Sequence, residues 1–194
     1  MSPSVPLPSD ADLTEEARKT LATLPPLHVF RMMANAPASL RPFLDLAGSI
    51  LIGSEFDARK REIAVLRVAH VTGSSYEWTQ HERLGRNLGL EAAEIDAIAA
   101  DGPVTGLDEE GRLLCRVADE ISRDVRLSDE ALSAIMARYG VRQATELIVC
   151  CSYFNMLSRF LESTRVELEA DDLIGDRIPG EVAGAAGSAP EADA

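Results

Sequence analysis

Cysteine, aromatic residues and positive charge are all scarce in this 194-residue chain, and aromatic residues make up only 5% of it. Its three cysteines, Cys115, Cys150 and Cys151, include no Cys-x-x-Cys spacing, so the sequence predicts a reducing compartment and neither a disulfide framework nor a zinc knuckle. No apolar run approaches the roughly 18 residues that a membrane-spanning helix needs. The first residues also lack the basic start and apolar stretch of a secretory signal. We therefore expect a cytoplasmic protein without a membrane partner.

The deficit of positive charge excludes a further class of partner. Lysine and arginine number 19 against 32 aspartates and glutamates, which gives a net charge of −13 at pH 7. Nucleic acids and anionic lipid surfaces bind through clustered Lys and Arg, so neither is an expected partner. The excess is uneven, because residues 167–194 hold eight acidic residues and one arginine. The net charge thus describes mainly the C-terminal tail and says little about the charge of a substrate.

Apolar residues are plentiful, at 46% of the chain, and they supply the core of a globular domain. Their spacing by three and four predicts helices, and no convincing alternation of β-branched residues predicts a strand. We predict an all-α fold of about eight helices. Composition further predicts a flexible lead-in over residues 1–10, a single helical domain over 11–170 and a flexible acidic tail over 171–194.

Proline and glycine mark where these helices should begin and end. Pro25 and Pro26 must end a first segment that starts near residue 12, and Thr72-Gly73 separates a helix over 57–72 from one over 74–88. Tyr139-Gly140 should end a helix that starts at Ser128, leaving 141–169 as the longest apolar-rich helix.

One segment brings several reactive side chain types together. If Thr72-Gly73 reverses the chain between two antiparallel helices, Glu62 falls near His81, and Glu77 lies one helical turn from the same histidine. Two carboxylates beside one imidazole can fix its tautomer, raise its pKa and let it move protons. We interpret His81, Glu62 and Glu77 as a candidate acid/base centre. Ser74 shares their helix face and could hydrogen-bond a substrate.

A purely structural interpretation of the same residues stands beside this one. Ser74 and Glu77 have the spacing of a capping box, in which the serine caps the helix and the glutamate returns to its backbone amide. His70 has no carboxylate within a helical turn and fits a satisfied, partly buried histidine better than a substrate-binding one. Trp78 fits core or pocket wall, and arginines such as Arg67 and Arg86 are usually solvated on helix surfaces.

The stretch from Arg61-Glu62-Ile to Gly89-Leu90, continuing through Glu94-Ile-Asp-Ala-Ile, resembles the carboxymuconolactone decarboxylase and alkylhydroperoxidase D-like (AhpD-like) superfamily. Later regions, from Leu107 and from Glu146 to Arg159, resemble its second half. The resemblance implies an all-α, AhpD-like helical bundle that assembles as a homo-oligomer, a trimer or hexamer or else a dimer. It also implies a small-molecule substrate and a site near subunit contacts.

The peroxidase branch of this superfamily carries Glu, eleven residues, Cys-x-x-Cys, three residues and His. Here Glu62 and His81 match that pattern, but Ser74 and Glu77 occupy the cysteine positions. A serine cannot enter a thiol oxidation cycle, so the peroxiredoxin-type activity of that branch should not carry over. The decarboxylase branch, which also lacks the cysteine pair, is the nearer model.

Three hypotheses follow. The first is a decarboxylase-like lyase that acts without cofactor or metal on a carboxylated lactone or related acid. In this hypothesis the catalytic residues are His81, Glu62 and Glu77, and the substrate-binding residues are Ser74, Trp78 and His70. The second is a non-catalytic oligomeric binding module. The third is a peroxidase that uses another thiol, which is disfavoured because Cys150 and Cys151 are adjacent on a helix and best interpreted, like Cys115, as buried inert thiols.

Overall fold

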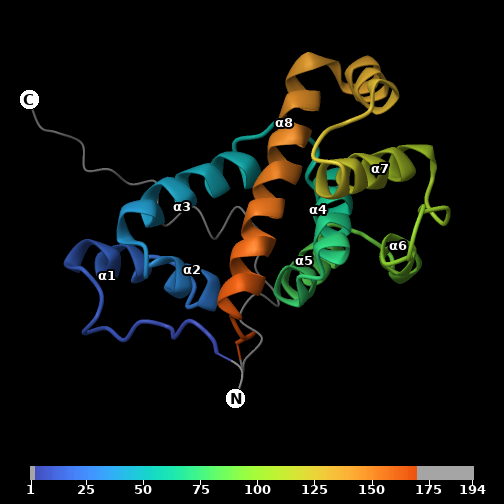
Figure 1. The fold of residues 1–194 in the computed structure, drawn as a ribbon. Helices are drawn as coiled ribbons and strands as arrows, with labels where there is room; N and C mark the ends of the chain where they lie inside the picture. The colour runs from blue at the N-terminus through green and yellow to red at the C-terminus, as the bar shows by residue number, and fades with distance from the viewer. Residues whose placement is uncertain (1–2, 170–194) are drawn as a thin grey trace, which may run out of the picture. The chain divides into compact units, whose positions relative to one another are not determined.

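The computed structural model describes residues 3–169 and consists of helices, with no β-strand in that range. The all-α prediction is confirmed. The predicted acidic tail, 171–194, lies outside the described residues. In chain order the helices, labelled in Figure 1, are α1 (Glu15–Leu21), α2 (His28–Met33), α3 (Pro37–Leu51), α4 (Ala58–Thr72), α5 (Ser75–Asn87), α6 (Ala92–Ile98), α7 (Glu109–Arg123) and α8 (Asp129–Thr164).

Contacts between residues divide the chain into two compact units. One comprises Ser54–Arg165, with helices α4 to α8, and the described residues on either side of it form the other. The single domain predicted over 11–170 spans both units and stays a prediction. In the second of these units, α3 packs against both α1 and α2. Part of the predicted lead-in is held there, because the carbonyls of Pro6 and Pro8 accept hydrogen bonds from Asn35 and Arg31.

Helix α4 is the centre of the unit formed by Ser54–Arg165. It packs against α5, α6, α7 and α8, and every residue from Arg61 to Ala69 is buried. Asp57 caps its start by accepting a hydrogen bond from the Lys60 amide, and Gly73, with φ of 70°, ends it in the left-handed conformation that favours glycine. A polar side chain on α4 is therefore desolvated unless it reaches a neighbouring helix.

Helix α8 is interrupted where the sequence predicts a break. Gly140, with φ of 74° and ψ of 171°, is not helical, and Figure 1 shows the helix bending in its upper part. The predicted end at residue 169 is wrong, because Arg165 adopts a left-handed conformation and the helix stops at Thr164.

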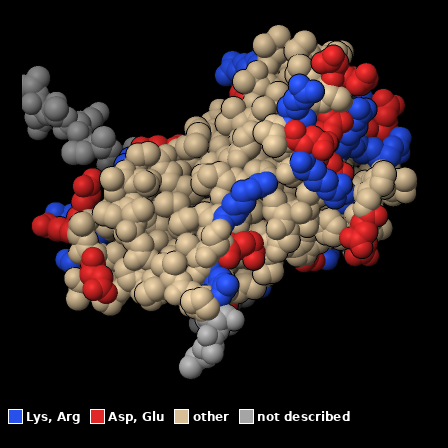
Figure 2. Space-filling view, in the orientation of Figure 1, with Lys and Arg blue, Asp and Glu red and all other residues tan. Residues whose placement is uncertain are grey.

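Charged side chains of both signs gather over α7 and the first part of α8 (Figure 2), where ion pairs join Arg138 to Glu109 and Glu110, and Arg142 to Glu146. Among residues 3–169, no helix is long and apolar enough to cross a membrane.

Candidate active site

The three side chains that the sequence predicts to form an acid/base centre lie together in the structure. Nδ1 of His81 lies 2.6 Å from Oε2 of Glu62, and Nε2 of the same ring lies 3.5 Å from Oε2 of Glu77. Both carboxylates are buried, Glu62 completely, and the His81 side chain is only 11% exposed. The imidazole is thus held between two desolvated carboxyl groups.

The turn between α4 and α5 creates this arrangement. Gly73 reverses the chain, and the backbone amide of Ser74 closes the turn on the carbonyl of Ala69. Glu62 and His81 then meet across two packed helices, while Glu77 and His81 are one turn apart on α5.

Burial and charge set the proton affinities of the centre. Burial raises the pKa of Glu77 to about 7, an effect that the positive charge of His81 opposes. For His81, burial alone would lower the pKa, but the charge of Glu62 and its hydrogen bond reverse this and raise the pKa above its usual value. The pairing with Glu62 therefore favours the imidazolium form of His81, and the neighbouring Glu77 has a pKa of about 7.

Helix α8 supplies a third wall that the sequence did not assign to the site. The ring of Phe154 meets the His81 ring edge to face, with centroids 4.8 Å apart, and Tyr153 packs edge to face on Phe154. Burial, followed by the charge of Glu77, raises the pKa of the Tyr153 phenol. These aromatic side chains reduce water access to the imidazole and strengthen its interactions with the carboxylates.

The capping-box interpretation of Ser74 and Glu77 is wrong. Ser74 is the N-cap residue of α5, but its side chain makes no capping hydrogen bond within the described part of the chain. Its Oγ is buried without a hydrogen-bond partner there, and so is Oε2 of Glu77. The Ser74 amide donates instead to the Ala69 carbonyl at 2.9 Å, and the buried Glu77 carboxylate lies 3.5 Å from the imidazole.

We therefore expect the Ser74→Ala variant to keep or gain stability, by up to about 1 kcal/mol, because it removes a buried hydroxyl that has no partner. Ser128 is the matched control, since its Oγ accepts from the Ala131 amide at the start of α8. Ser128→Ala should lose about 1 kcal/mol. Urea unfolding measures both variants. Equal losses at the two positions would restore the capping role of Ser74.

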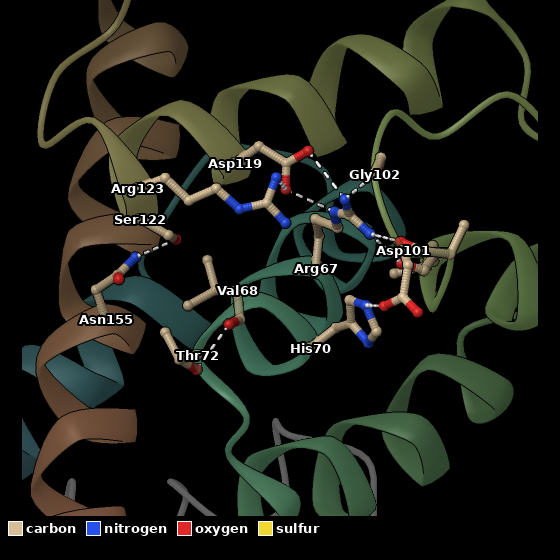
Figure 3. Close-up of polar contacts among 12 residues, drawn as sticks. Arg67, Val68, His70, Thr72, Asp101, Gly102, Asp119, Ser122, Arg123 and Asn155 are labelled. Carbon is tan, nitrogen blue, oxygen red and sulfur yellow. Dashed lines mark hydrogen bonds and ion pairs between the residues drawn. The ribbon is translucent and has the colours of Figure 1, made fainter.

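His70 and Trp78 form a separate cluster. Their rings meet at a centroid distance of 6.1 Å, and His70 Nε2 lies 3.6 Å from a carboxylate oxygen of the fully exposed Asp101. Figure 3 shows the His70 side chain pointing from α4 toward Asp101. The sequence missed this carboxylate because it comes from the loop after α6 rather than from the same helix. The substrate-binding role of His70 and Trp78 stays a prediction.

Arg67 is not the solvated surface residue that its position on a helix suggested. It is fully buried, and its guanidinium pairs with Asp119 on α7 at 2.7 and 3.0 Å. It also donates to the carbonyls of Ile98, Ala100 and Gly102, which ties the loop after α6 to α4 (Figure 3). Because every nitrogen of the guanidinium donates to a protein group, we interpret Arg67 as a structural residue. Arg86 is exposed and pairs with Glu82 on its own helix, as a surface arginine should.

The cysteines are buried, and burial raises the pKa of Cys115 and Cys151 to about 12 and that of Cys150 well above its usual value. The thiolate is the nucleophilic form, so these thiols have little of the reactive species at neutral pH. Within residues 3–169, no group of three or more His, Cys, Asp or Glu side chains is arranged to hold a metal ion.

A pocket of about 240 Å³ lies elsewhere in the same unit, between α4, the start of α7 and Glu94 of α6. Two ion pairs occupy its walls, Arg59 with Glu94 and Lys60 with Glu110. None of the predicted site residues lines it.

Sequence reasoning also missed Arg61. This side chain is only 3% exposed, and its Nε lies 3.3 Å from Oε1 of Glu62, the carboxylate whose other oxygen holds His81. The available signal was its place beside Glu62 at the start of a helix predicted to be buried.

A comparison with protein families finds a match over part of the unit that carries these residues. Residues 37–120, which include Glu62, Ser74, Glu77 and His81, match the model of the carboxymuconolactone decarboxylase family. The match spans 84 of the 194 residues, so it shows similarity to that family over this part of the chain. A comparison with curated proteins gives no significant match.

Solved structures of other proteins have a similar fold. An uncharacterized peroxidase-related protein from Silicibacter is 17% identical, with a TM-score of 0.73 over 90% of this chain and 96% of its own. A peroxidase-related protein with an alkylhydroperoxidase AhpD core, from Ralstonia eutropha, is 15% identical with a TM-score of 0.74 over the same shares. A putative antioxidant defence protein AhpD from Agrobacterium tumefaciens is 17% identical with a TM-score of 0.61, over 72% of this chain and 96% of its own. At these identities the structural similarity shows the fold alone.

Proposed function

We propose that the protein is a small-molecule enzyme that uses His81 in acid/base chemistry, without a thiol, on a carboxylated lactone or a related acid. The observation that carries this proposal is the His81 ring held between Glu62 and Glu77. Beside it, Ser74 Oγ and Glu77 Oε2 are buried and make no hydrogen bond within residues 3–169. Buried polar groups are almost always hydrogen-bonded, and orphans cluster at sites that bind a ligand. A substrate that bonds to Ser74 and Glu77 would lie against the imidazole.

The chemistry follows from the proton affinities. When a carboxylate leaves as CO₂ from the carbon α to the lactone carbonyl, or from the γ carbon of an α,β-unsaturated lactone after the C=C bond has moved into conjugation with that carbon, the bond between the carboxylate and the ring carbon breaks. The electron pair is then delocalised onto the lactone carbonyl as an enolate or dienolate. A proton must then be delivered to carbon, so the overall reaction consumes one proton and needs no oxidant. Glu77, with a pKa of about 7, is suited to donate that proton, and the imidazolium of His81 stabilises the developing negative charge. Glu62 fixes the ring through Nδ1.

The peroxidase-related descriptions of two structural neighbours make thiol peroxidase activity the second candidate. Ser74 and Glu77 stand where that chemistry needs its cysteine pair, and the three cysteines that remain are buried and protonated. The remaining alternative, a non-catalytic binding module, implies that Ser74 and Glu77 merely cap the helix, and the Ser74 side chain makes no capping hydrogen bond within the described residues. The homo-oligomer expected from the resemblance stays a prediction.

A paired assay tests the proposal. We expect the wild-type protein to release CO₂ from a member of a panel of carboxylated γ-lactones. It should consume no hydroperoxide in the presence of a dithiol reductant. The variant with Cys115, Cys150 and Cys151 all replaced by Ala, checked for folding by circular dichroism, should behave like the wild type in both assays because the thiols take no part. Hydroperoxide consumption that disappears in this variant would instead identify a thiol peroxidase.

A further inference from the structure

One more charged side chain at this site has a nitrogen that makes no hydrogen bond among the described residues. Arg61 lies on α4 next to Glu62, and its Nη2 is buried with no hydrogen-bond partner in the part of the chain that the structure covers. A buried guanidinium N–H without an acceptor is costly, because the group has lost its hydration and gained no protein contact. Buried arginines normally donate hydrogen bonds to carboxylates or carbonyls, as Arg67 does to the Asp119 carboxylate and the Ile98 carbonyl.

The position of Arg61 joins it to the acid/base centre. Its Nε contacts Oε1 of Glu62 at 3.3 Å, while Oε2 of the same carboxylate contacts His81 at 2.6 Å. Its charge lowers the proton affinity of His81 and also acts on the Cys150 thiol, so the guanidinium lies near both α5 and α8. Arg61 and the His81 ring thus contact the two oxygens of the same Glu62 carboxylate.

The charged groups around His81 carry an excess of positive charge, which favours binding of an anion. The single carboxylate of Glu62 lies between two cations, Arg61 and the His81 imidazolium. Glu77 compensates only in part, because burial keeps a large share of it protonated near neutral pH. An anionic ligand restores neutrality and accepts the hydrogen bond that Nη2 offers, and a carboxylate matches the geometry of a guanidinium.

We propose that Arg61 binds the carboxylate of the ligand through its unpartnered Nη2 and so selects anionic over neutral lactones. This inference rests on the proposed function for its ligand class, since it places a carboxylated small molecule beside His81. Arg61 is then a substrate-binding residue, whereas Glu62, which both Arg61 and His81 contact, positions the two groups relative to each other.

Binding of a matched pair of compounds tests this. The anionic compound is 5-oxotetrahydrofuran-2-carboxylate, a γ-lactone acid, and the neutral one is its methyl ester. Isothermal titration should find that the wild type binds the acid at least about tenfold more tightly than the ester. Arg61→Met, which keeps the length of the side chain and removes its donors, should lose at least about tenfold in affinity for the acid and little for the ester.

Two further variants complete the design. Arg61→Lys keeps the charge without the planar fork and should fall between the wild type and Arg61→Met; it also decides the matter if the methionine variant fails to fold. Arg86→Met removes an exposed arginine from outside the site and should bind both compounds as the wild type does. Equal affinity of the wild type for acid and ester, or no binding of the acid, would overturn the proposal. So would a folded Arg61→Met, or Arg61→Lys if it alone folds, with wild-type affinity for the acid.

The outcome is separable from that of the proposed function. Loss of turnover in a His81 variant together with unchanged acid binding in Arg61→Met would retain the acid/base centre and refute the role of Arg61. Selective loss of acid binding in Arg61→Met, with full turnover in the His81 variant, would retain the role of Arg61 and refute the acid/base centre. If Nη2 instead pairs with a carboxylate of a second copy of the chain, Arg61→Met should change the mass measured by light scattering and leave the acid-to-ester ratio unchanged, which also refutes the proposal.

Discussion

His81→Gln should lower kcat on the carboxylated lactone by about 10² to 10⁴-fold, the usual contribution of a positioned acid/base group. Glutamine fills a similar volume but cannot carry the positive charge that faces Glu62 and Glu77. Steady-state kinetics on the panel member that gives turnover measures the loss, and circular dichroism checks that the fold is kept.

The control for this loss is a histidine elsewhere in the chain. His28 lies at the start of α2, where its Nδ1 is 2.8 Å from the Glu167 carbonyl, and His28→Gln should keep full activity. Glu62→Gln should reduce kcat as well, because the amide still accepts from Nδ1 but no longer stabilises the imidazolium. Full activity in both His81→Gln and Glu62→Gln would remove the acid/base assignment.

The pH profile tells which group donates the proton. Because burial raises the pKa of Glu77 to about 7, the protonated carboxyl prevails below that pH and is lost above it. If Glu77 is the donor, kcat/KM should fall as the pH rises through about 7, and Glu77→Gln should abolish that limb. A limb that persists in Glu77→Gln would assign the proton to His81 instead.

Arg67→Met should lower the free energy of unfolding by about 3–5 kcal/mol, because it leaves a partly buried carboxylate and three backbone carbonyls without their donor. Asp119 is only 17% exposed, and the carbonyls of Ile98, Ala100 and Gly102 depend on the same guanidinium. Urea unfolding of the wild type and the variant measures the difference.

Arg86→Met is the matched control, since Arg86 makes an exposed ion pair with Glu82 four residues away. Such pairs contribute about 0.3–0.5 kcal/mol. The double variant Arg67→Met with Asp119→Leu should recover part of the loss, because it removes the carboxylate that then keeps only the 3.8 Å ion pair with Arg123. A loss below about 1 kcal/mol in Arg67→Met would show that the loop after α6 does not depend on this side chain.

The meeting of Glu62 with His81 could be predicted from the sequence because it depends on local geometry. A Thr-Gly pair between two helical patterns reverses the chain, and helical rise then decides which residues lie opposite each other. Glu77 and His81 share a helix face for the same reason. The break at Gly140 was predictable too, since glycine favours the backbone conformation found there.

Local patterns failed where burial was decided by other helices. Ser74 and Glu77 have the letters of a capping box, but packing turned Glu77 toward His81. Arg67 looked like a surface arginine until α7 and the loop after α6 supplied its acceptors. Tyr153 and Phe154 were separated from His81 by about 70 residues, and no periodicity connects them to it.

The sequence by itself thus determined the helical class, the turn at Gly73 and the pairing of His81 with its two carboxylates, all of which follow from helix period and chain reversal. The tertiary structure decided which polar groups lose water and which find partners. It gave Arg67 five hydrogen bonds to Asp119 and three backbone carbonyls, and it left Ser74 Oγ, Glu77 Oε2 and Arg61 Nη2 without a hydrogen bond among residues 3–169. Desolvation depends on every element packed around a side chain, and that information is not contained in the spacing of residues along one helix.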